Sequence, residues 1–204
     1  MSGYTDMQAR IADEIARSDL TSQIQLAILS AVKHYAKERW YFTETNTTFA
    51  TVAGTQTYAL PTDFKAMDRV RLTYPTNSYW DLSYRPFEYL GQITSINTLT
   101  GPPQDYSIYG QLIWLYPIPD AVYTITEYYE QELTSLSTTP DNAWMVDGEE
   151  LIRSRAKADV YENVIRDVPD DVAACRAREA DAYAQLRNSS TTRIVQGRVL
   201  PQFF

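Results

Sequence analysis

The chain has little of what most catalytic and metal-binding proteins use. Among its 204 residues there are one cysteine, one histidine and seven glycines. Cys175 alone cannot form an internal disulfide or a zinc site built from several thiolates. The sequence also lacks the glycine-rich nucleotide loops, the HExxH zinc motif and the EF-hand calcium loop. We therefore predict no cofactor, no metal site and no catalytic residues.

The two residues that could still carry catalysis have simpler interpretations. A Ser-His-Asp or Cys-His site would have to use His34, which lies in a predicted helix far in sequence from any elbow-like serine. Cys175 is next to Arg176, a neighbour that favours a thiolate, but alanines surround it in the sequence. We interpret His34 as a solvated or packed helix residue and Cys175 as a small packing residue.

Long apolar runs and an excess of positive charge are also absent. No stretch approaches the ~18 apolar residues needed to cross a bilayer, and no signal peptide is visible, so we expect no membrane partner. The net charge is −8, whereas nucleic-acid-binding domains usually carry a basic face. The C-terminal end differs, because from Arg187 onward there are three arginines and no acidic residue.

Helical periodicity occupies both ends of the chain. It predicts helices over residues 4–18, 20–42, 149–168 and 171–188, with a polar break at 188–192. The first two could be read as a helix-turn-helix unit, but the second helix offers no Arg/Asn/Gln-rich face for base edges. A stripe of alanines on the last helix predicts close packing against another helix. The stripe consists of Ala173, Ala177, Ala180 and Ala184.

Between these helices the apolar period changes to two, which predicts strands. We expect a hairpin over residues 49–60, strands at 70–74 and 79–84, and a short helix at 86–90. A three-stranded meander is expected over 102–132.

In this meander Gly110 and Gln111 match the Gly-X pattern of a type II′ hairpin turn. The strand that follows the turn has apolar side chains on both faces, so we expect both faces to be covered.

These elements predict an α+β fold. The simplest architecture is a four-helix bundle, made of two N-terminal and two C-terminal helices, with an inserted antiparallel β domain and an extended C-terminal tail. The expected parts are the first half of the bundle, the β insertion with one short helix, the second half of the bundle and the tail, at residues 1–46, 47–140, 141–188 and 189–204.

Three acidic residues at the end of the meander leave one enzymatic alternative. Glycoside hydrolysis needs only two carboxylates, and Glu127, Glu130 and Glu132 follow a stretch of aromatic residues that could stack on sugar rings. Acids that end an exposed strand more often keep a sheet edge soluble. A carbohydrate-active, cell-wall-degrading domain is therefore the alternative to a non-enzymatic function.

The last twelve residues combine apolar and basic side chains. A disordered terminus is the simple interpretation, since chain ends often lack order. Six of these twelve residues are apolar, however, and segments that stay disordered are poor in such residues. We predict that the extended tail docks into a groove on another protein. The residues expected to dock are Arg193, Ile194, Val195, Arg198, Val199, Leu200, Phe203 and Phe204.

Several motifs follow one another in a characteristic order over nearly the whole chain. They are residues 15–24, 31–42, 58–64, 101–103, 106–120, 123–126 and 128–129. The most telling is Gly101-Pro102-Pro103 followed by the tyrosine-rich strands. In this combination the chain resembles the head-to-tail adaptors of tailed bacteriophages, also known as head-completion or tail tubular A-like proteins.

The resemblance implies a structural virion protein at the head–tail junction, made in the host cytoplasm. Such adaptors form a ring, typically of twelve copies, below the portal of the filled capsid. The ring continues the DNA channel, helps to retain the packaged genome and attaches the tail. The implied partners are the portal protein, a downstream tail or nozzle protein and further copies of the chain.

Two further expectations follow from the resemblance. Packaged DNA would pass through the channel without specific binding, since an acidic wall repels phosphates. The C-terminal segment of these adaptors reaches onto the portal, a role that residues 193–204 match in position and character.

A ring subunit also needs apolar surface on both flanks. The predicted helix 149–168 carries apolar residues on two sides, which implies contacts from two directions. The candidates for the interface between subunits are Leu151, Ile152, Val160, Tyr161 and Val164 of this helix and Trp114 of the β insertion.

Overall fold

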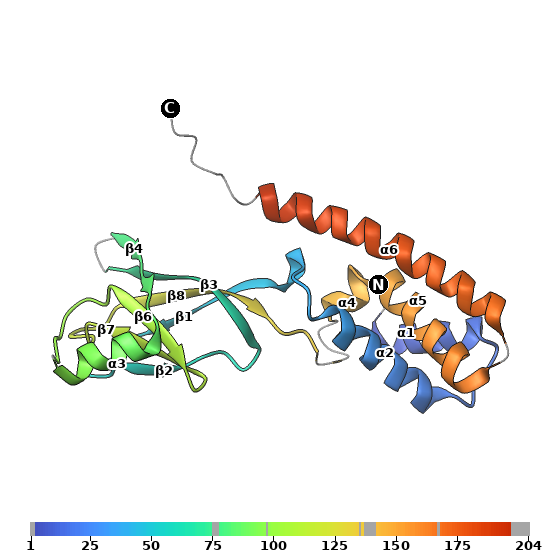
Figure 1. Ribbon diagram of the computed structural model, residues 1–204, viewed down its shortest axis with the longest axis horizontal. Coiled ribbons are helices and arrows are strands. Elements are labelled where there is room, and N and C mark those ends of the chain that lie inside the picture. The colour runs from blue at the N-terminus through green and yellow to red at the C-terminus, as the bar shows by residue number, and fades with distance from the viewer. Residues whose placement is uncertain are drawn as a thin grey trace. The chain divides into compact units, whose positions relative to one another are not determined.

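The computed structural model describes residues 3–74, 78–96, 98–134, 136, 142–166 and 168–196, with side chains up to residue 194. Six α-helices and two antiparallel-rich sheets in this part of the chain give an α+β fold (Figure 1). The chain divides into a helical unit, built from the residues up to Thr43 and those from Leu133 onward, and a β unit, Glu44–Glu132. Within the described residues, no helix combines the length and apolarity that crossing a bilayer requires.

The helical unit is organised around one central helix, α5. This helix packs against α2 and α6 and also touches α1 and α4 (Figure 1). The core of the helical unit combines Met7 and Ile11 of α1, Ile28 of α2 and Ile152 of α5. The helices are α1 Tyr4–Glu14, α2 Thr21–Tyr35, α4 Ala143–Val146, α5 Glu149–Val160 and α6 Pro169–Gln196, with a 3₁₀ turn at Tyr41–Thr43 and a π-helical turn at Tyr161–Ile165.

Helix α2 ends at Tyr35, earlier than the aromatic residues at 40–42 had suggested. The chain leaves the helix so that Trp40 can enter the core, where it is fully buried and its Nε1 donates to the Tyr35 carbonyl at 2.9 Å. The Trp40 ring meets Trp144 edge to face, with 5.7 Å between the centroids. Burial of a large aromatic side chain therefore outweighs continuation of the helix here.

The predicted polar break at 188–192 is wrong. Helix α6 runs through it to Gln196, so residues 189–196 are helical rather than part of an extended tail. The hydroxyls of Thr191 and Thr192 each donate to the carbonyl one turn earlier, at 2.9 Å. Ser190 is buried and its Oγ accepts the Tyr41 backbone N–H at 3.0 Å. Serine and threonine hydroxyls often end a helix by hydrogen-bonding to the backbone, but here they form hydrogen bonds within α6 or to Tyr41, so the helix continues.

The alanine stripe of α6 does not pack against a helix of this chain. All four alanines are exposed to solvent. The helix packs instead through Cys175, Glu179 and Leu186, all of which are buried. Burial of Cys175 raises the pKa of its thiol, which confirms its interpretation as a packing residue.

Asn142 begins the short helix α4 and ties it to the preceding segment. Its Oδ1 accepts the Trp144 N–H at 2.9 Å, and its Nδ2 donates to the Leu133 carbonyl at 3.1 Å. Replacing Asn142 by alanine is expected to lower the free energy of unfolding by about 1 kcal/mol, because the first N–H groups of α4 lose their cap. Asn142→Ser, which keeps a cap acceptor and loses the bond to Leu133 as alanine does, should lose less. Urea titrations followed by tryptophan fluorescence compare the two, and equal losses would contradict the capping role.

The β unit consists of two four-stranded sheets. Their strand orders are β1-β8-β3-β4 and β2-β7-β6-β5, and every pair is antiparallel except β5 with β6. The strands are β1 Glu44–Ala50, β2 Thr57–Ala59, β3 Phe64–Thr73, β4 Tyr79–Asp81, β5 Ser83–Tyr84, β6 Asp105–Tyr109, β7 Leu112–Tyr116 and β8 Thr124–Gln131.

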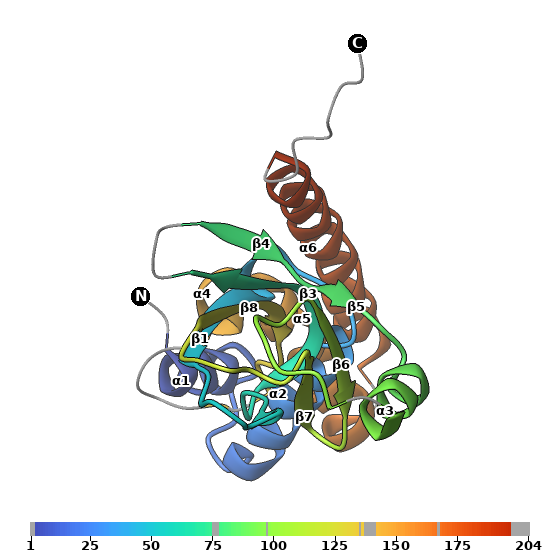
Figure 2. The same ribbon diagram turned by 90° about the vertical axis from the view of Figure 1, so that its left-hand side faces the viewer.

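One core joins the inward faces of both sheets. It contains Val70 and Ile125 of the first sheet and Ile113 and Leu115 of the second. Helix α3, Phe87–Ile96, lies beside β6 (Figure 2). Its Phe87 ring meets Trp114 of β7 at 5.1 Å. Helix α3 therefore covers part of the outward face of β7, whose inward face is buried in the core.

Two predicted strand pairings are wrong. Strands β1 and β2 do not form a hairpin, because β1 pairs with β8 and β2 pairs with β7 in the other sheet. The 102–132 segment is no meander either, since β8 leaves β6 and β7 to lie between β1 and β3. The predicted β6–β7 hairpin is confirmed, but its turn is type I′, because Gly110 and Gln111 both have φ of 62°.

Candidate interaction surfaces

The C-terminal end of α6 carries the beginning of the predicted docking tail. Arg193 lies over the Tyr41 ring, 4.1 Å from its centroid, and Ile194 is half-buried. The Tyr41 hydroxyl donates to Asp147 Oδ1 at 2.6 Å, and burial together with this bond raises the pKa of Tyr41 to about 12. Val195 also belongs to the helix. The remaining tail residues, Arg198, Val199, Leu200, Phe203 and Phe204, lie outside the described residues.

Three of the predicted interface residues have no surface to offer another subunit. Leu151, Ile152 and Val160 are at most 1% exposed, because they fill the core between α5 and its neighbours. The two apolar sides of α5 are thus contacted from two directions within one chain, which accounts for the burial of these three residues.

The other three candidates retain exposed surface. Val164 is 39% exposed, whereas Tyr161 and Trp114 are half-buried. Tyr161 packs against the core of the helical unit, and Trp114 lies against Phe87 in the β unit.

The acidic residues of the enzymatic alternative do not converge. Glu127 is 1% exposed and points with Ile125 and Tyr129 into the core of the β unit. Glu130 lies on the other face of β8, where Lys65 Nζ is 2.7 Å from its Oε1. Glu132 is exposed beyond the end of the strand. Glu127 and Glu130 thus point to opposite faces of β8, so these two carboxylates do not face a common space as glycoside hydrolysis requires.

A carboxylate that sequence reasoning missed lies between α2, α5 and α6. Glu179 is buried and accepts the Tyr35 hydroxyl at 2.5 Å, Arg155 at 2.7 Å and Arg176 at 2.8 Å. Burial opposes its ionisation, but the three hydrogen bonds and the arginine charges outweigh burial and lower the pKa of Glu179. Arg176 also pairs with Glu162 at 2.8 Å. This network fastens α6 to both neighbouring helices.

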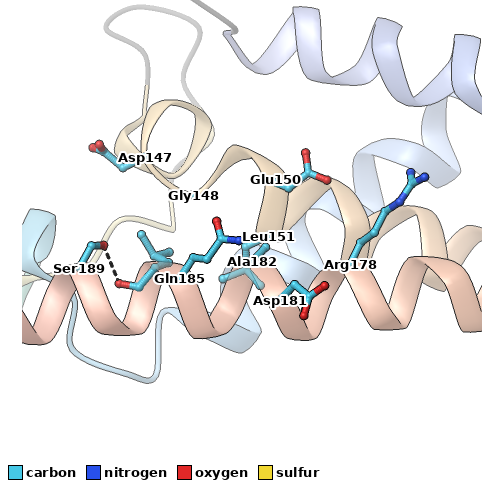
Figure 3. Close-up of a pocket in the computed structure, with 10 residues that line it drawn as sticks. Asp147, Gly148, Glu150, Leu151, Arg178, Asp181, Ala182, Gln185 and Ser189 are labelled. Atoms are coloured by element: carbon cyan, nitrogen blue, oxygen red, sulfur yellow. Dashed lines mark hydrogen bonds between the residues drawn. The ribbon is translucent and has the colours of Figure 1, made fainter.

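An acidic groove runs between the start of α5 and the middle of α6 (Figure 3). Its volume is about 520 Å³. Ala182 is the partly exposed apolar residue of the floor, beneath which Leu151 and Leu186 are buried, and the rim is predominantly acidic. The charged residues that line it are Asp147, Glu150, Asp181 and Arg178.

Gly148 shapes the end of this groove. A Cβ at this position would come within 2.8 Å of Trp144 Cε3, so only glycine lets the chain pass this closely from α4 to α5. The Asp147-Gly148 pair is a turn signal that could have marked the site in the sequence. Glu150 and Leu151 follow directly in α5, but the remaining lining residues come from α6, about thirty positions later, and nothing in the sequence links the two stretches.

His34, the only histidine of the chain, is exposed on α2. Slight desolvation of the largely exposed imidazole and the neighbouring charges of Arg155 and Lys37 lower its pKa, which favours the neutral form. Its ring contacts Tyr35 edge to face at 4.9 Å. His34 is thus a solvent-exposed helix residue, one of the two interpretations that the sequence allowed.

Comparison with known proteins identifies one family. The family described as SU10 adaptor protein matches residues 2–200 of the chain. No protein among the curated sequences matches this chain.

Proposed function

Because the chain belongs to the SU10 adaptor protein family, a family of phage head-to-tail adaptors, we propose that it forms a ring below the portal of the capsid. In this proposal the ring continues the DNA channel and carries the tail. Its partners are the portal protein, a downstream tail or nozzle protein and other copies of the chain, with twelve copies in the ring. The role is structural, at the head–tail junction of the virion.

The observation that carries this proposal is the extent of the family match. It covers residues 2–200 and therefore both the helical unit and the β unit. The helices α1, α2, α5 and α6 contribute to one core, and on this basis we propose that they form a four-helix bundle. The net charge of −8 supports passage of DNA without specific binding.

We further propose that the C-terminal segment docks onto the portal. Since α6 continues to Gln196, the docking segment is best defined as residues 197–204, presented by the last turn of the helix. This segment carries Arg198, Val199, Leu200, Phe203 and Phe204. Each phenylalanine buried in the portal would contribute on the order of 2 kcal/mol, and a ring multiplies these small contributions through avidity.

Truncation after Gln196 tests this docking. The cut leaves α6 intact, including the Ser190 contact to Tyr41, so the helical unit should fold normally. We expect the truncated chain to lose attachment to portal-bearing capsids, as measured by co-sedimentation.

The double substitution Phe203→Ser and Phe204→Ser, which keeps the chain length, should weaken attachment in the same direction. A matched control, Thr191→Ala, removes a hydroxyl on the exposed side of α6 and should leave attachment unchanged. Undiminished attachment of the truncated chain would show that the tail does not hold the ring to the portal.

A further inference from the structure

A basic stripe runs along the solvent-facing side of α2. Lys33, His34 and Lys37 are exposed there, and Arg155 of α5 borders them. Leu26 lies on the same side and is 67% exposed, which is unusual for a leucine in a helix that otherwise buries its apolar residues. Together with Leu29 and Ser30 these residues line a shallow depression of about 440 Å³, and none of its described lining residues is acidic.

The acidic groove between α5 and α6 has the opposite character. Three acidic side chains and one arginine surround an apolar floor there, whereas basic side chains surround exposed Leu26 on the stripe. On the stripe, positive charge surrounds the exposed Leu26, and in the groove negative charge surrounds an apolar floor. The two surfaces are therefore complementary. Surfaces with this complementarity steer two proteins together and fix how they align.

The stripe and the groove lie on different flanks of the helical unit. Glu179 and Tyr183 of α6 face Tyr35 of α2. The Tyr35 hydroxyl donates to Glu179 at 2.5 Å, and the ring centroids of Tyr35 and Tyr183 are 5.9 Å apart. Asp181 and Gln185 follow them by two positions, which is about 200° around the helix, and they line the groove (Figure 3). The groove therefore opens on the side of α6 that faces away from α2.

We propose that the basic stripe of one copy docks into the acidic groove of the next copy. Each copy then uses two different surfaces, so the contact is heterologous and repeats from copy to copy, closing into a ring when the rotation between copies permits. The proposal rests on the ring of the proposed function and names the surfaces that join its subunits. Lys33 and Lys37 supply the positive side, and Asp181 the negative side.

DNA is the other macromolecule that two exposed lysines could hold. The exposed Leu26 beside them favours a protein surface, since phosphate contacts need no apolar centre. The acidic charge of the whole chain also repels a nucleic acid.

Charge reversal provides the test. Lys33→Glu with Lys37→Glu makes the stripe acidic, and Asp181→Lys makes the rim of the groove less acidic; all three side chains are exposed, so folding should be retained. On portal-bearing capsids, either variant alone should need at least about tenfold more protein than the wild type for half-maximal occupancy. The chain with all three substitutions should recover part of this loss, because the acidic stripe then meets a rim that is no longer acidic. An equimolar mixture of the two variants, which can alternate around the ring, should recover part of it as well.

The matched control is Arg17→Glu with Arg166→Glu. It changes the net charge as much as the stripe variant does, at two exposed residues of the helical unit outside both surfaces, and it should assemble like the wild type. Assembly of the stripe and groove variants at wild-type concentrations, or failure of the mixture and the triple variant to recover, would overturn the proposal. The proposal would also be overturned if the wild type bound DNA, the stripe variant did not, and the stripe variant still assembled like the wild type.

The proposed function fails separately, if the wild type does not attach to portals at all. In that case the wild type, the stripe variant, the groove variant and the triple variant are compared free in solution. Sedimentation at millimolar concentration measures the self-association of each. Self-association that follows the charge pattern supports the stripe-and-groove contact. Self-association that ignores it, or none, overturns the contact.

Discussion

Replacing Glu179 by alanine is expected to lower the free energy of unfolding of the helical unit by about 3 kcal/mol. The substitution leaves Arg155 and Arg176 facing each other without their shared carboxylate, and it removes the acceptor of the Tyr35 hydroxyl. Like charges at a partly buried site then repel, and a buried hydroxyl loses its partner. Urea unfolding followed by circular dichroism at the helical band measures the loss.

Two comparisons separate charge from packing at this site. Glu179→Gln keeps the shape and an acceptor for Tyr35 but removes the charge, so its loss should be intermediate. Glu38→Ala is the matched control, because Glu38 also bridges a tyrosine and an arginine of α6, Tyr183 at 3.0 Å and Arg187 at 3.2 Å, but is more exposed. It should cost less than about 1 kcal/mol. Equal losses for Glu179→Ala and Glu38→Ala would contradict a special role for the buried carboxylate.

The pH dependence of the Glu179 contribution has a defined sign. Its pKa is lowered from the ordinary value of 4.5, so the carboxylate stabilises the fold above that value and this contribution is lost as the pH falls through the lowered pKa. The stability difference between the wild type and Glu179→Gln should therefore shrink in acid. A difference that stays constant down to the acid limit of folding would argue that charge does not matter at this position.

The second large effect concerns Glu127, which should make the β unit less stable as the pH rises from about 4.5 to about 7. Its carboxyl lies in the core beside Val70 and Thr47, and Oε1 has no hydrogen-bond partner among the described residues. Burial raises the pKa from 4.5 to about 7. Between these values the unfolded chain is ionised while the folded chain holds its proton, so stability falls by about 3 kcal/mol across the window.

Glu127→Gln and Glu127→Leu test this window. Both variants lack the titrating group. Their free energy of unfolding relative to that of the wild type should therefore rise by about 3 kcal/mol as the pH is raised from 4.5 to 8. Any constant offset that arises from packing does not affect this change. Thermal or urea unfolding over the pH series measures it. Stability curves that run parallel for the wild type and both variants would show that Glu127 is not the titrating group.

The sequence predicts elements better than it predicts their partners. Periodicity places the start of α5 at Glu149, and the local turn signal at Gly110 locates the β6–β7 hairpin. The pairing of β1 with β8 joins Phe49 to Ile125, far apart in the chain. Alternation of apolar residues shows that a strand has one buried face but not which strand lies beside it. The expected hairpin of residues 49–60 failed for this reason.

The interaction surfaces were harder to predict than the fold. Leu151 and Leu26 are both apolar residues of helices, yet the first is buried in the core and the second is largely exposed. A sequence does not distinguish an apolar residue that packs within the chain from one that is free to meet a partner. Glu179 was missed for the converse reason, since a charged residue on a helix suggests solvent unless its partners are known.

The length of α6 has a mechanical consequence. Its 28 residues form a rod of about 42 Å, fastened to α5 along part of its length and to Tyr41 near its end through Ser190 and Arg193. A pull applied at Gln196 along the helix axis loads these attachments in shear, so that they resist together instead of peeling apart one by one. The last helix is thus shaped to transmit tension from its tip into the body of the helical unit.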